Sequence, residues 1–181
     1  MPARARAYVH WADAHIRRKG AAMKSTDTAP AAVEAAPAPD HKLQLDAWPF
    51  YWITRVTNLY LERLEVELKR IGLDVPRWRV LMSLHAKDSS SVSEIAELAI
   101  VKLPTMTKIV QRMVGDGLVT CRTSAADGRV TEVLLTETGH EARRRAWAIA
   151  RQVYAQAFEG VTAAEIRRLN AVLSRVFENL Y

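Results

Sequence analysis

The chain has 181 residues, a length that supports one domain with a substantial hydrophobic core. A composition of 49% apolar and 25% charged residues excludes a chain that is disordered throughout, and no uninterrupted apolar run approaches the ~20 residues needed to cross a bilayer. The net charge of +6 is compatible with a polyanionic partner but does not by itself establish one.

Residues 1–40 differ from the rest and are expected to form a flexible N-terminal tail and linker. Residues 24–40 are rich in alanine, proline and threonine, whereas residues 8–18 have the spacing of a short amphipathic helix. Met23 is a plausible alternative translation start. We expect the tail to contribute little, although its arginines would also suit a DNA-contacting arm. Because these arginines precede no apolar signal-peptide core, we expect a cytoplasmic protein.

The domain is expected to span residues 41–181, and its first long helix residues 46–71. Pro49 suits the first turn of that helix, and Gly72 suits its end. The helix has two apolar stripes, which are Ile53, Val56, Tyr60, Leu64, Leu68 and Ile71 on one side and Leu45, Trp52, Leu59 and Val66 on the other. Two stripes exceed what one domain core needs, so we expect burial against another chain.

Three shorter helices are predicted next. One opens at Pro76, a second begins at Ser91, which forms a capping box with Glu94, and a third begins at Pro104 and ends near Gly115. The last two form a helix–turn–helix pattern. In the third helix a buried stripe is predicted for Met106, Ile109, Val110, Met113 and Val114.

The opposite face of the third helix is polar and suits a major groove. It carries Thr105, Thr107, Lys108, Gln111 and Arg112. Threonine offers a hydroxyl and a methyl group, Gln111 can pair with adenine, and lysine or arginine can reach guanine or phosphate. Such a face on an isolated helix would most simply be a solvated surface. We favour DNA recognition because of the segment that follows.

Residues 118–122 and 130–135 are two β-prone runs around a polar turn, an arrangement that predicts a hairpin. The turn presents Arg129, and Asp127 can hold its guanidinium by a charge-assisted hydrogen bond. A basic hairpin beside a recognition helix can contact a second groove or the phosphates. Arg122 is a further candidate for this contact.

Two long helices are predicted after the hairpin. Thr136 can cap the first, whose seam is Ala142, Ala146, Ile149, Ala150, Val153 and Ala157. A capping box of Thr162 and Glu165 opens the last helix, which has Ile166, Leu169, Leu173, Val176, Phe177 and Leu180 on one face. Surplus apolar surface at both ends of the domain suits an intertwined two-fold dimer. Its recognition helices would then read half-sites about 34 Å apart.

The spacing Asp127-x-Arg129-x5-Leu135-Thr136-x2-Gly139 resembles the wing signature of MarR-type winged helix–turn–helix transcription regulators. The resemblance covers about residues 45–181. It implies a mainly α fold with a small β-wing, in which a DNA-binding lobe of residues 76–135 lies between dimerisation helices of residues 45–72 and 136–180. It also implies a homodimeric repressor that binds double-stranded DNA at a pseudo-palindromic operator. Many members carry two arginines at the wing tip, whereas here Gly128 precedes a single Arg129.

A ligand site is predicted from aromatic residues near guanidinium groups. Trp48, Tyr51, Trp52 and Arg55 crowd the start of the first helix, and Trp78 lies in the second beside Arg77 and Arg79. Aromatic walls and a cation suit an aromatic carboxylate or its thioester, in agreement with the phenolic and aromatic acids that MarR-like proteins often bind. Core or dimer packing is the alternative for each aromatic residue.

Other functional classes have less support. The histidines have no metal-ligand spacing, and no nucleophile or phosphate-loop motif is present, so we expect neither an enzyme nor a cofactor. A winged-helix protein-binding adaptor would require a less charged recognition face. The single cysteine, Cys121, excludes an internal disulfide framework, and Arg122 beside it could lower its pKa. Thiol-based redox sensing stays an alternative to a structural role.

Overall fold

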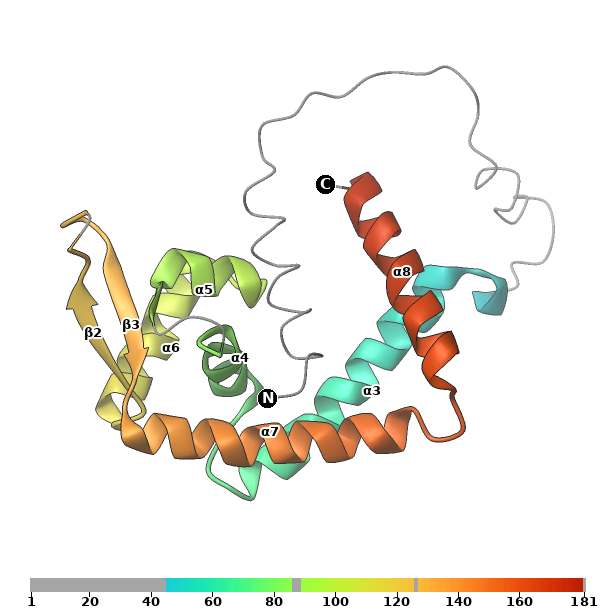
Figure 1. Cartoon of the computed structure of the whole chain (residues 1–181), viewed down its shortest axis with the longest axis horizontal. Helices are drawn as coiled ribbons and strands as arrows, with labels where there is room; N and C mark the ends of the chain where they lie inside the picture. The colour runs from blue at the N-terminus through green and yellow to red at the C-terminus, as the bar shows by residue number, and fades with distance from the viewer. Residues whose placement is uncertain (1–44, 86–88, 126, 181) are drawn as a thin grey trace, which may run out of the picture.

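A computed structural model describes residues 45–85, 89–125 and 127–180. The expectations for the tail of residues 1–40 lie outside these ranges. The elements in chain order are η1 (Leu45–Ala47), α3 (Pro49–Lys69), α4 (Val75–Ser83), β1 (Ser89–Ser91), α5 (Val92–Leu98), α6 (Leu103–Gly115), β2 (Val119–Thr123), β3 (Thr131–Leu135), α7 (Glu137–Ala157) and α8 (Ala163–Leu180). Figure 1 shows α4, α5, α6 and the sheet at one end of α7, with α3 and α8 toward its other end.

Helix starts follow the predicted caps. Ser91 and Glu94 form the expected capping box of α5, and the Thr136 hydroxyl accepts from the Gly139 N–H at the start of α7. At α8, the Thr162 N–H donates to the Glu165 carboxylate, and the Glu165 N–H donates back to the threonine hydroxyl. The predicted start of the first long helix is wrong by a few residues. The turn η1 precedes α3, which begins at Pro49 after an extended Trp48.

The sheet has three antiparallel strands in the order β1-β3-β2. The hairpin of β2 and β3 lies within one residue of its predicted strands, with Cys121 opposite Val133 and Arg122 opposite Glu132. Strand β1 was not expected, because its three serines carry no β-branched or aromatic signal. It forms because β3 has a free edge, where Ser90 pairs with Val133.

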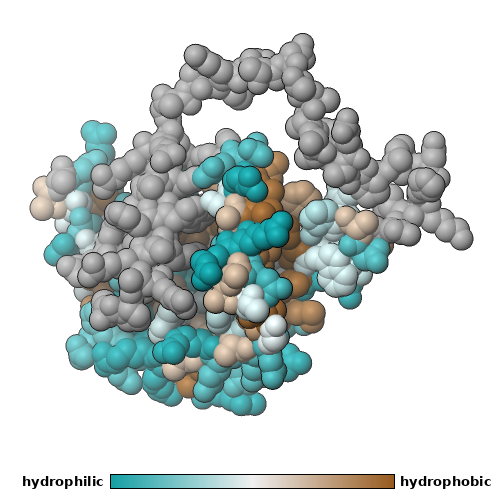
Figure 2. Space-filling model, turned by 45° about the vertical axis from the view of Figure 1, so that its right-hand side comes forward, coloured by the Kyte–Doolittle hydropathy of each residue, from teal (hydrophilic) through white to brown (hydrophobic). Residues whose placement is uncertain are grey.

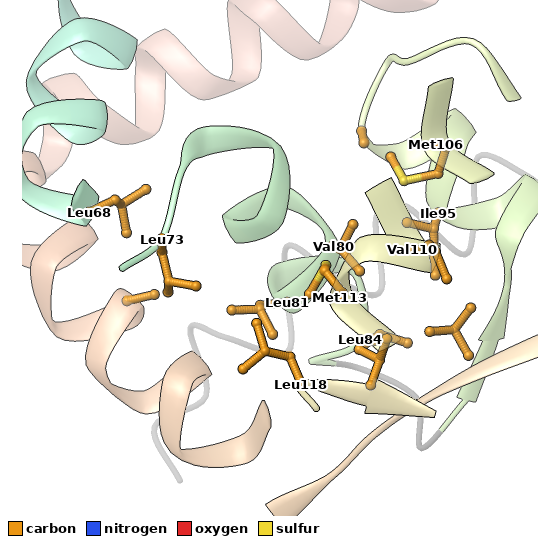
Figure 3. Packing of buried hydrophobic residues seen from close by; sticks show 14 of the residues in the cluster. Leu68, Leu73, Val80, Leu81, Leu84, Ile95, Met106, Val110, Met113 and Leu118 are labelled. Carbon is orange, nitrogen blue, oxygen red and sulfur yellow. The ribbon is translucent and has the colours of Figure 1, made fainter. Parts of the chain in front are cut away.

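The core lies where α3, α4, α5, α6, α7 and the base of the hairpin meet. Figure 3 shows buried side chains from these elements and from the residues that adjoin them packed together: Leu68, Leu73, Val80, Leu81, Leu84, Ile95, Met106, Val110, Met113 and Leu118. The predicted stripe of α6 is buried at Met106, Val110 and Met113 and partly buried at Ile109. Val114 is an exception. It is exposed, because it lies near the end of α6 and at the edge of the buried face.

The helices at the two ends of the domain keep large apolar surfaces exposed. On α3 only Leu64 and Leu68 are buried, and the whole predicted second stripe of that helix is exposed. Helix α8 has no buried residue, although Leu169, Leu173 and Phe177 lie on one face. The seam of α7 is buried at Ala146, Ala150 and Val153, whereas Ala157 is exposed. Figure 2 turns the α3 and α8 side forward, and hydrophobic residues gather in its middle.

Among the described residues, none of the helices combines the length and the apolar character that a membrane span requires.

Candidate nucleic-acid interface

Helix α6 separates its buried face cleanly from its polar face. Met106 and Val110 pack into the core, while the five polar residues predicted to face DNA are all exposed: Thr105, Thr107, Lys108, Gln111 and Arg112. The helix begins at Leu103 with Pro104 in its first turn, and it ends at Gly115 before Gly117 adopts a φ of 69°. The core therefore orients the polar side chains outward.

The five polar side chains are not equally available to a base edge. The Thr107 hydroxyl donates to the Leu103 carbonyl at 2.9 Å, so its proton is engaged within the helix. Its methyl group and its acceptor lone pairs stay available. Among the described residues, no ion pair engages Lys108 or Arg112, both of which carry long exposed side chains. The lysine and the arginine are therefore the two cations of this face that lie exposed without an ion pair among the described residues.

The hairpin projects from the lobe beside α6 (Figure 1). At its tip Arg129 is exposed, and the Asp127 carboxylate accepts from the backbone N–H of Arg129 at 3.0 Å. The expected bond from Asp127 to the guanidinium is not among the contacts of the described residues. A bond two residues along the chain is the ordinary use of aspartate in a turn. Asp127 thus shapes the turn, and the guanidinium of Arg129 stays directed to solvent.

Arg122 lies on β2 and is engaged across the sheet. Its Nε donates to Glu132 on β3 at 2.9 Å, and the Ser124 hydroxyl donates to the other oxygen of the same carboxylate at 2.9 Å. These partners lower the pKa of Glu132 below its ordinary value, with Arg122 as the main cause. Arg122 is therefore less available for phosphate than Arg129, although it was predicted as a second contact.

Arg77 ties α6 to α4, a role that sequence reasoning missed. Its guanidinium donates to Asp74 at 2.8 Å and to Asp116, the C-cap of α6, at 2.8 and 3.1 Å. These carboxylates, Asp116 first, raise the pKa of Arg77. The pair joins residues 39 positions apart, and no local sequence signal indicates such a contact. Arg77 thus helps to hold the end of α6, and its guanidinium is already engaged by two carboxylates.

The base of the hairpin is fastened to α7. The Thr136 hydroxyl donates to the Gly117 carbonyl at 2.6 Å, and its backbone N–H donates to the Leu118 carbonyl at 3.2 Å. The same hydroxyl caps α7 through Gly139. One threonine therefore links the turn between α6 and β2 to the start of α7.

The predicted ligand residues fall into two groups. Trp48, Tyr51, Trp52 and Arg55 cluster at the start of α3, where the Arg55 guanidinium lies 5.2 Å from the Tyr51 ring centroid. Trp78 instead packs edge-on against Tyr60, with ring centroids 6.4 Å apart. Since Tyr60 lies nine residues beyond Tyr51, about 13 Å along the helix, one subunit does not bring the two groups together. A cleft of about 360 Å³ beside Arg77, Asp116, Glu141 and Arg145 is lined by neither group.

Cys121 lies on β2 and is exposed. Desolvation raises the pKa of its thiol, which corrects the expectation that Arg122 would lower it. Adjacent strand residues point to opposite faces, and Arg122 is directed to Glu132. A thiol with a raised pKa is a poor redox sensor.

Comparisons with known proteins agree with this geometry. The model of the MarR family matches residues 73–131. A protein of Pseudomonas putida named "HTH-type transcriptional repressor IacR" is 47% identical over 144 residues, which are 80% of this chain and 86% of that relative.

Two solved structures share the fold. A mutant MarR from E. coli complexed with operator DNA aligns with a TM-score of 0.66 at 21% identity, covering 75% of this chain and 99% of the other. BpsR of Bordetella bronchiseptica, described with regulation of its DNA binding by 6-hydroxynicotinic acid, aligns with a TM-score of 0.63 at 18% identity, covering 70% and 96%. The family model and the relative that is 47% identical over 80% of this chain lead to one conclusion: this chain belongs to the MarR family of DNA-binding transcription regulators, and it is not an enzyme.

Proposed function

We propose that the chain is a homodimeric repressor that binds a pseudo-palindromic operator and is released by a small aromatic acid or its thioester. The observation that carries the DNA part is the geometry of α6, which buries Met106, Val110 and Met113 and leaves a polar face exposed beside a hairpin that has the exposed Arg129 at its tip. The relative from Pseudomonas putida is named a repressor, and one structural neighbour is complexed with operator DNA.

In this proposal the two elements divide the work. The exposed polar face of α6 enters the major groove, where glutamine, threonine and the cations can bind base edges. It consists of Thr105, Thr107, Lys108, Gln111 and Arg112. Arg129 contacts the minor groove or the phosphates and supplies affinity with little sequence preference. Asp127 fixes the turn that presents Arg129. Arg122 contributes less, because Glu132 already holds it.

Dimerisation is supported by the apolar surfaces at the two ends of the domain. Leu59 and Val66 on α3 and Leu173 and Phe177 on α8 are all exposed in one subunit. Exposed apolar faces of this extent on two helices mark a protein interface. A two-fold dimer would bury them and place two recognition helices about 34 Å apart.

The proposed effector acts at the two groups of aromatic residues, one at Trp78 of α4 beside Tyr60 of α3 and the other at the start of α3. Trp78 offers a specific handle, because its indole Nε1 is buried and has no acceptor among the described residues. A buried donor without a partner is costly, so an acceptor from a ligand would be stabilised there. The second group, around Tyr51 and Arg55, carries a cation next to an aromatic face and would join the site only across the dimer. The neighbour regulated by 6-hydroxynicotinic acid supports an acid of this class.

An electrophoretic mobility shift with the DNA upstream of the chain's own coding region tests DNA binding. We expect a specific shift that unlabelled fragment of the same sequence removes and unrelated DNA does not. A protein-binding adaptor, the remaining alternative, gives no specific shift at low ionic strength, and that result would overturn the proposal.

The effector is tested by titrating a panel of aromatic carboxylic acids into the shifted complex while tryptophan fluorescence is recorded. One or more acids should quench the fluorescence and release the DNA. Trp78→Phe, which keeps an aromatic ring and removes the N–H donor, should respond less than wild type, whereas Trp147→Phe on the exposed side of α7 serves as the control. A panel without any response, or equal responses of both variants and wild type, would contradict the effector proposal.

A further inference from the structure

The turn between α5 and α6 holds an exposed aliphatic side chain in an unusual backbone conformation. Ile100 is 89% exposed, and its φ of 54° is the one positive value at a non-glycine position in the part of the chain that the structure describes. Positive φ brings Cβ close to the following carbonyl oxygen, and β-branched residues tolerate this worst. Ile100 therefore carries backbone strain without gaining from burial.

The strain arises because Ile100 occupies the left-handed cap of α5. The Val101 N–H donates to the Ala96 carbonyl at 2.9 Å, and the Ile100 N–H donates to the Glu97 carbonyl at 3.1 Å. These two bonds form a Schellman motif, in which glycine is the usual residue at the position of Ile100. Glycine would suit the fold better, and strained residues of this kind concentrate at binding sites.

Two further exposed leucines lie within three residues of Ile100 along the chain. Leu98 is 39% exposed and Leu103 is 49% exposed, whereas Ala99 between them is buried. We call Leu98, Ile100 and Leu103 the turn patch. Leu103 is the first residue of α6, so the turn patch runs directly into the polar face that begins at Thr105.

We propose that the turn patch contacts thymine C5-methyl groups in the operator, with Ile100 as the principal contact and a determinant of sequence specificity. The inference rests on the proposed DNA binding. The N-terminal residues of a recognition helix are the ones that contact base edges, and the thymine methyl is the apolar group that the major groove presents. Lys102, exposed within the same turn, can neutralise a neighbouring phosphate.

A second copy of the chain is a poorer occupant for the turn patch. The exposed apolar faces that suit dimerisation belong to α3 and α8, which lie toward the other end of α7 (Figure 1). The turn patch instead continues the exposed face of α6, whose neighbouring side chains are polar or cationic. DNA is the one proposed partner that meets both kinds of side chain at once.

The test replaces thymines by deoxyuridine, which lacks only the C5-methyl group. The probe is a duplex that the wild-type protein selects from a randomised pool, with each thymine replaced in turn. Wild type should lose affinity about fourfold at one position in each half-site, because burying one methylene is worth about 0.8 kcal/mol. Ile100→Gly should bind the thymine and deoxyuridine duplexes equally and should melt no lower than wild type, since glycine adopts positive φ without strain.

Val114→Ala is the matched control, because Val114 is an exposed aliphatic residue at the opposite end of α6. It should keep the wild-type discrimination between thymine and deoxyuridine. Three outcomes would overturn the inference: a wild type indifferent to every replacement, full discrimination retained in Ile100→Gly, or discrimination lost equally in Val114→Ala. A wild type that selects no sequence would overturn the proposed DNA recognition itself, and this inference with it.

Discussion

Gly139 lies so close to Leu118 that a Cβ at position 139 would overlap the Leu118 carbonyl oxygen. This contact presses the first turn of α7 against the base of the hairpin. The Thr136 hydroxyl secures the same junction through Gly117, so the wing and the long helix meet backbone to backbone. The Leu-Thr-x-x-Gly part of the wing signature thus has a steric explanation.

Gly139→Ala should destabilise the protein by about 1–3 kcal/mol, the usual cost of overpacking, although alanine has a higher helix propensity than glycine. Thermal unfolding followed by circular dichroism measures the change. Gly115→Ala is the matched control, because a Cβ at that helical position meets nothing within 4 Å. Equal melting temperatures for the two variants would contradict the steric account.

Arg129→Ala and Gln111→Ala should weaken DNA binding in different ways. Loss of one phosphate contact should lower affinity on all sequences and reduce the slope of log K against log salt by about one. Loss of the glutamine should relax preference at one base position, by about 1–3 kcal/mol of discrimination. Fluorescence anisotropy across a salt series and a set of single-base operator variants separates the two effects. Equal loss of preference in both variants would contradict the division of work.

Arg77→Ala should loosen the end of α6 and lower stability modestly. The Arg77–Asp116 pair is partly exposed, so a double-mutant cycle should give a coupling below about 1 kcal/mol. Urea denaturation of Arg77→Ala, Asp116→Ala and the double variant measures it. Additive effects of the two substitutions would show that the pair contributes nothing.

His85 should make stability depend on pH. Burial, helped by the charge of Arg143, lowers the pKa of His85 below 6.5, so the folded protein favours the neutral ring. Above about pH 6.5 the ring is neutral in both the folded and the unfolded chain, and no stability is lost. As the pH falls from about 6.5 toward the folded-state pKa, the unfolded chain binds the proton more readily, so the free energy of unfolding declines. His85→Phe keeps an aromatic ring stacked on Trp147 but cannot titrate. The melting temperature of wild type should therefore fall relative to this variant between about pH 7 and 5, and parallel curves would refute the assignment.

Phe177→Asp should dissociate the dimer and weaken DNA binding. A carboxylate would have to be buried in an apolar interface, which costs several kcal/mol. Ala171→Asp places the same charge on the opposite side of α8 and serves as the control. Analytical ultracentrifugation reports the assembly state. A dimeric Phe177→Asp protein would place the interface elsewhere.

The sequence predicted elements best where local chemistry decides them. The capping box at Ser91, the threonine cap at residue 136 and the left-handed Gly117 set helix limits through neighbouring residues alone. The buried stripe of α6 follows from helical periodicity. Val114 departed from it, because a residue near the end of a helix can lie beyond the edge of the core.

The contacts that the sequence did not predict join residues that are distant along the chain and meet only in the folded protein. Strand β1 forms because β3 offers an edge, and three serines give no sign of it. Two arginines that were expected near a ligand or DNA instead form ion pairs within the fold. Arg77 binds Asp116, and Arg122 binds Glu132. The exposed position of Arg129 at the tip of the hairpin was predicted correctly. Asp127 was expected to bind the guanidinium of Arg129, but the geometry of the turn brings its carboxylate to the backbone N–H of Arg129.

The most direct test of the account is chemical protection of guanine N7, which lies in the major groove. With the full-length protein bound to its selected duplex, methylation should be blocked in two patches about 10 base pairs apart on one side of the DNA. Lys108→Ala and Arg112→Ala together should remove that protection, because lysine and arginine are the side chains of this face that can reach guanine. Unaltered methylation at saturating protein, or a single patch, would contradict a pair of α6 helices in successive major grooves.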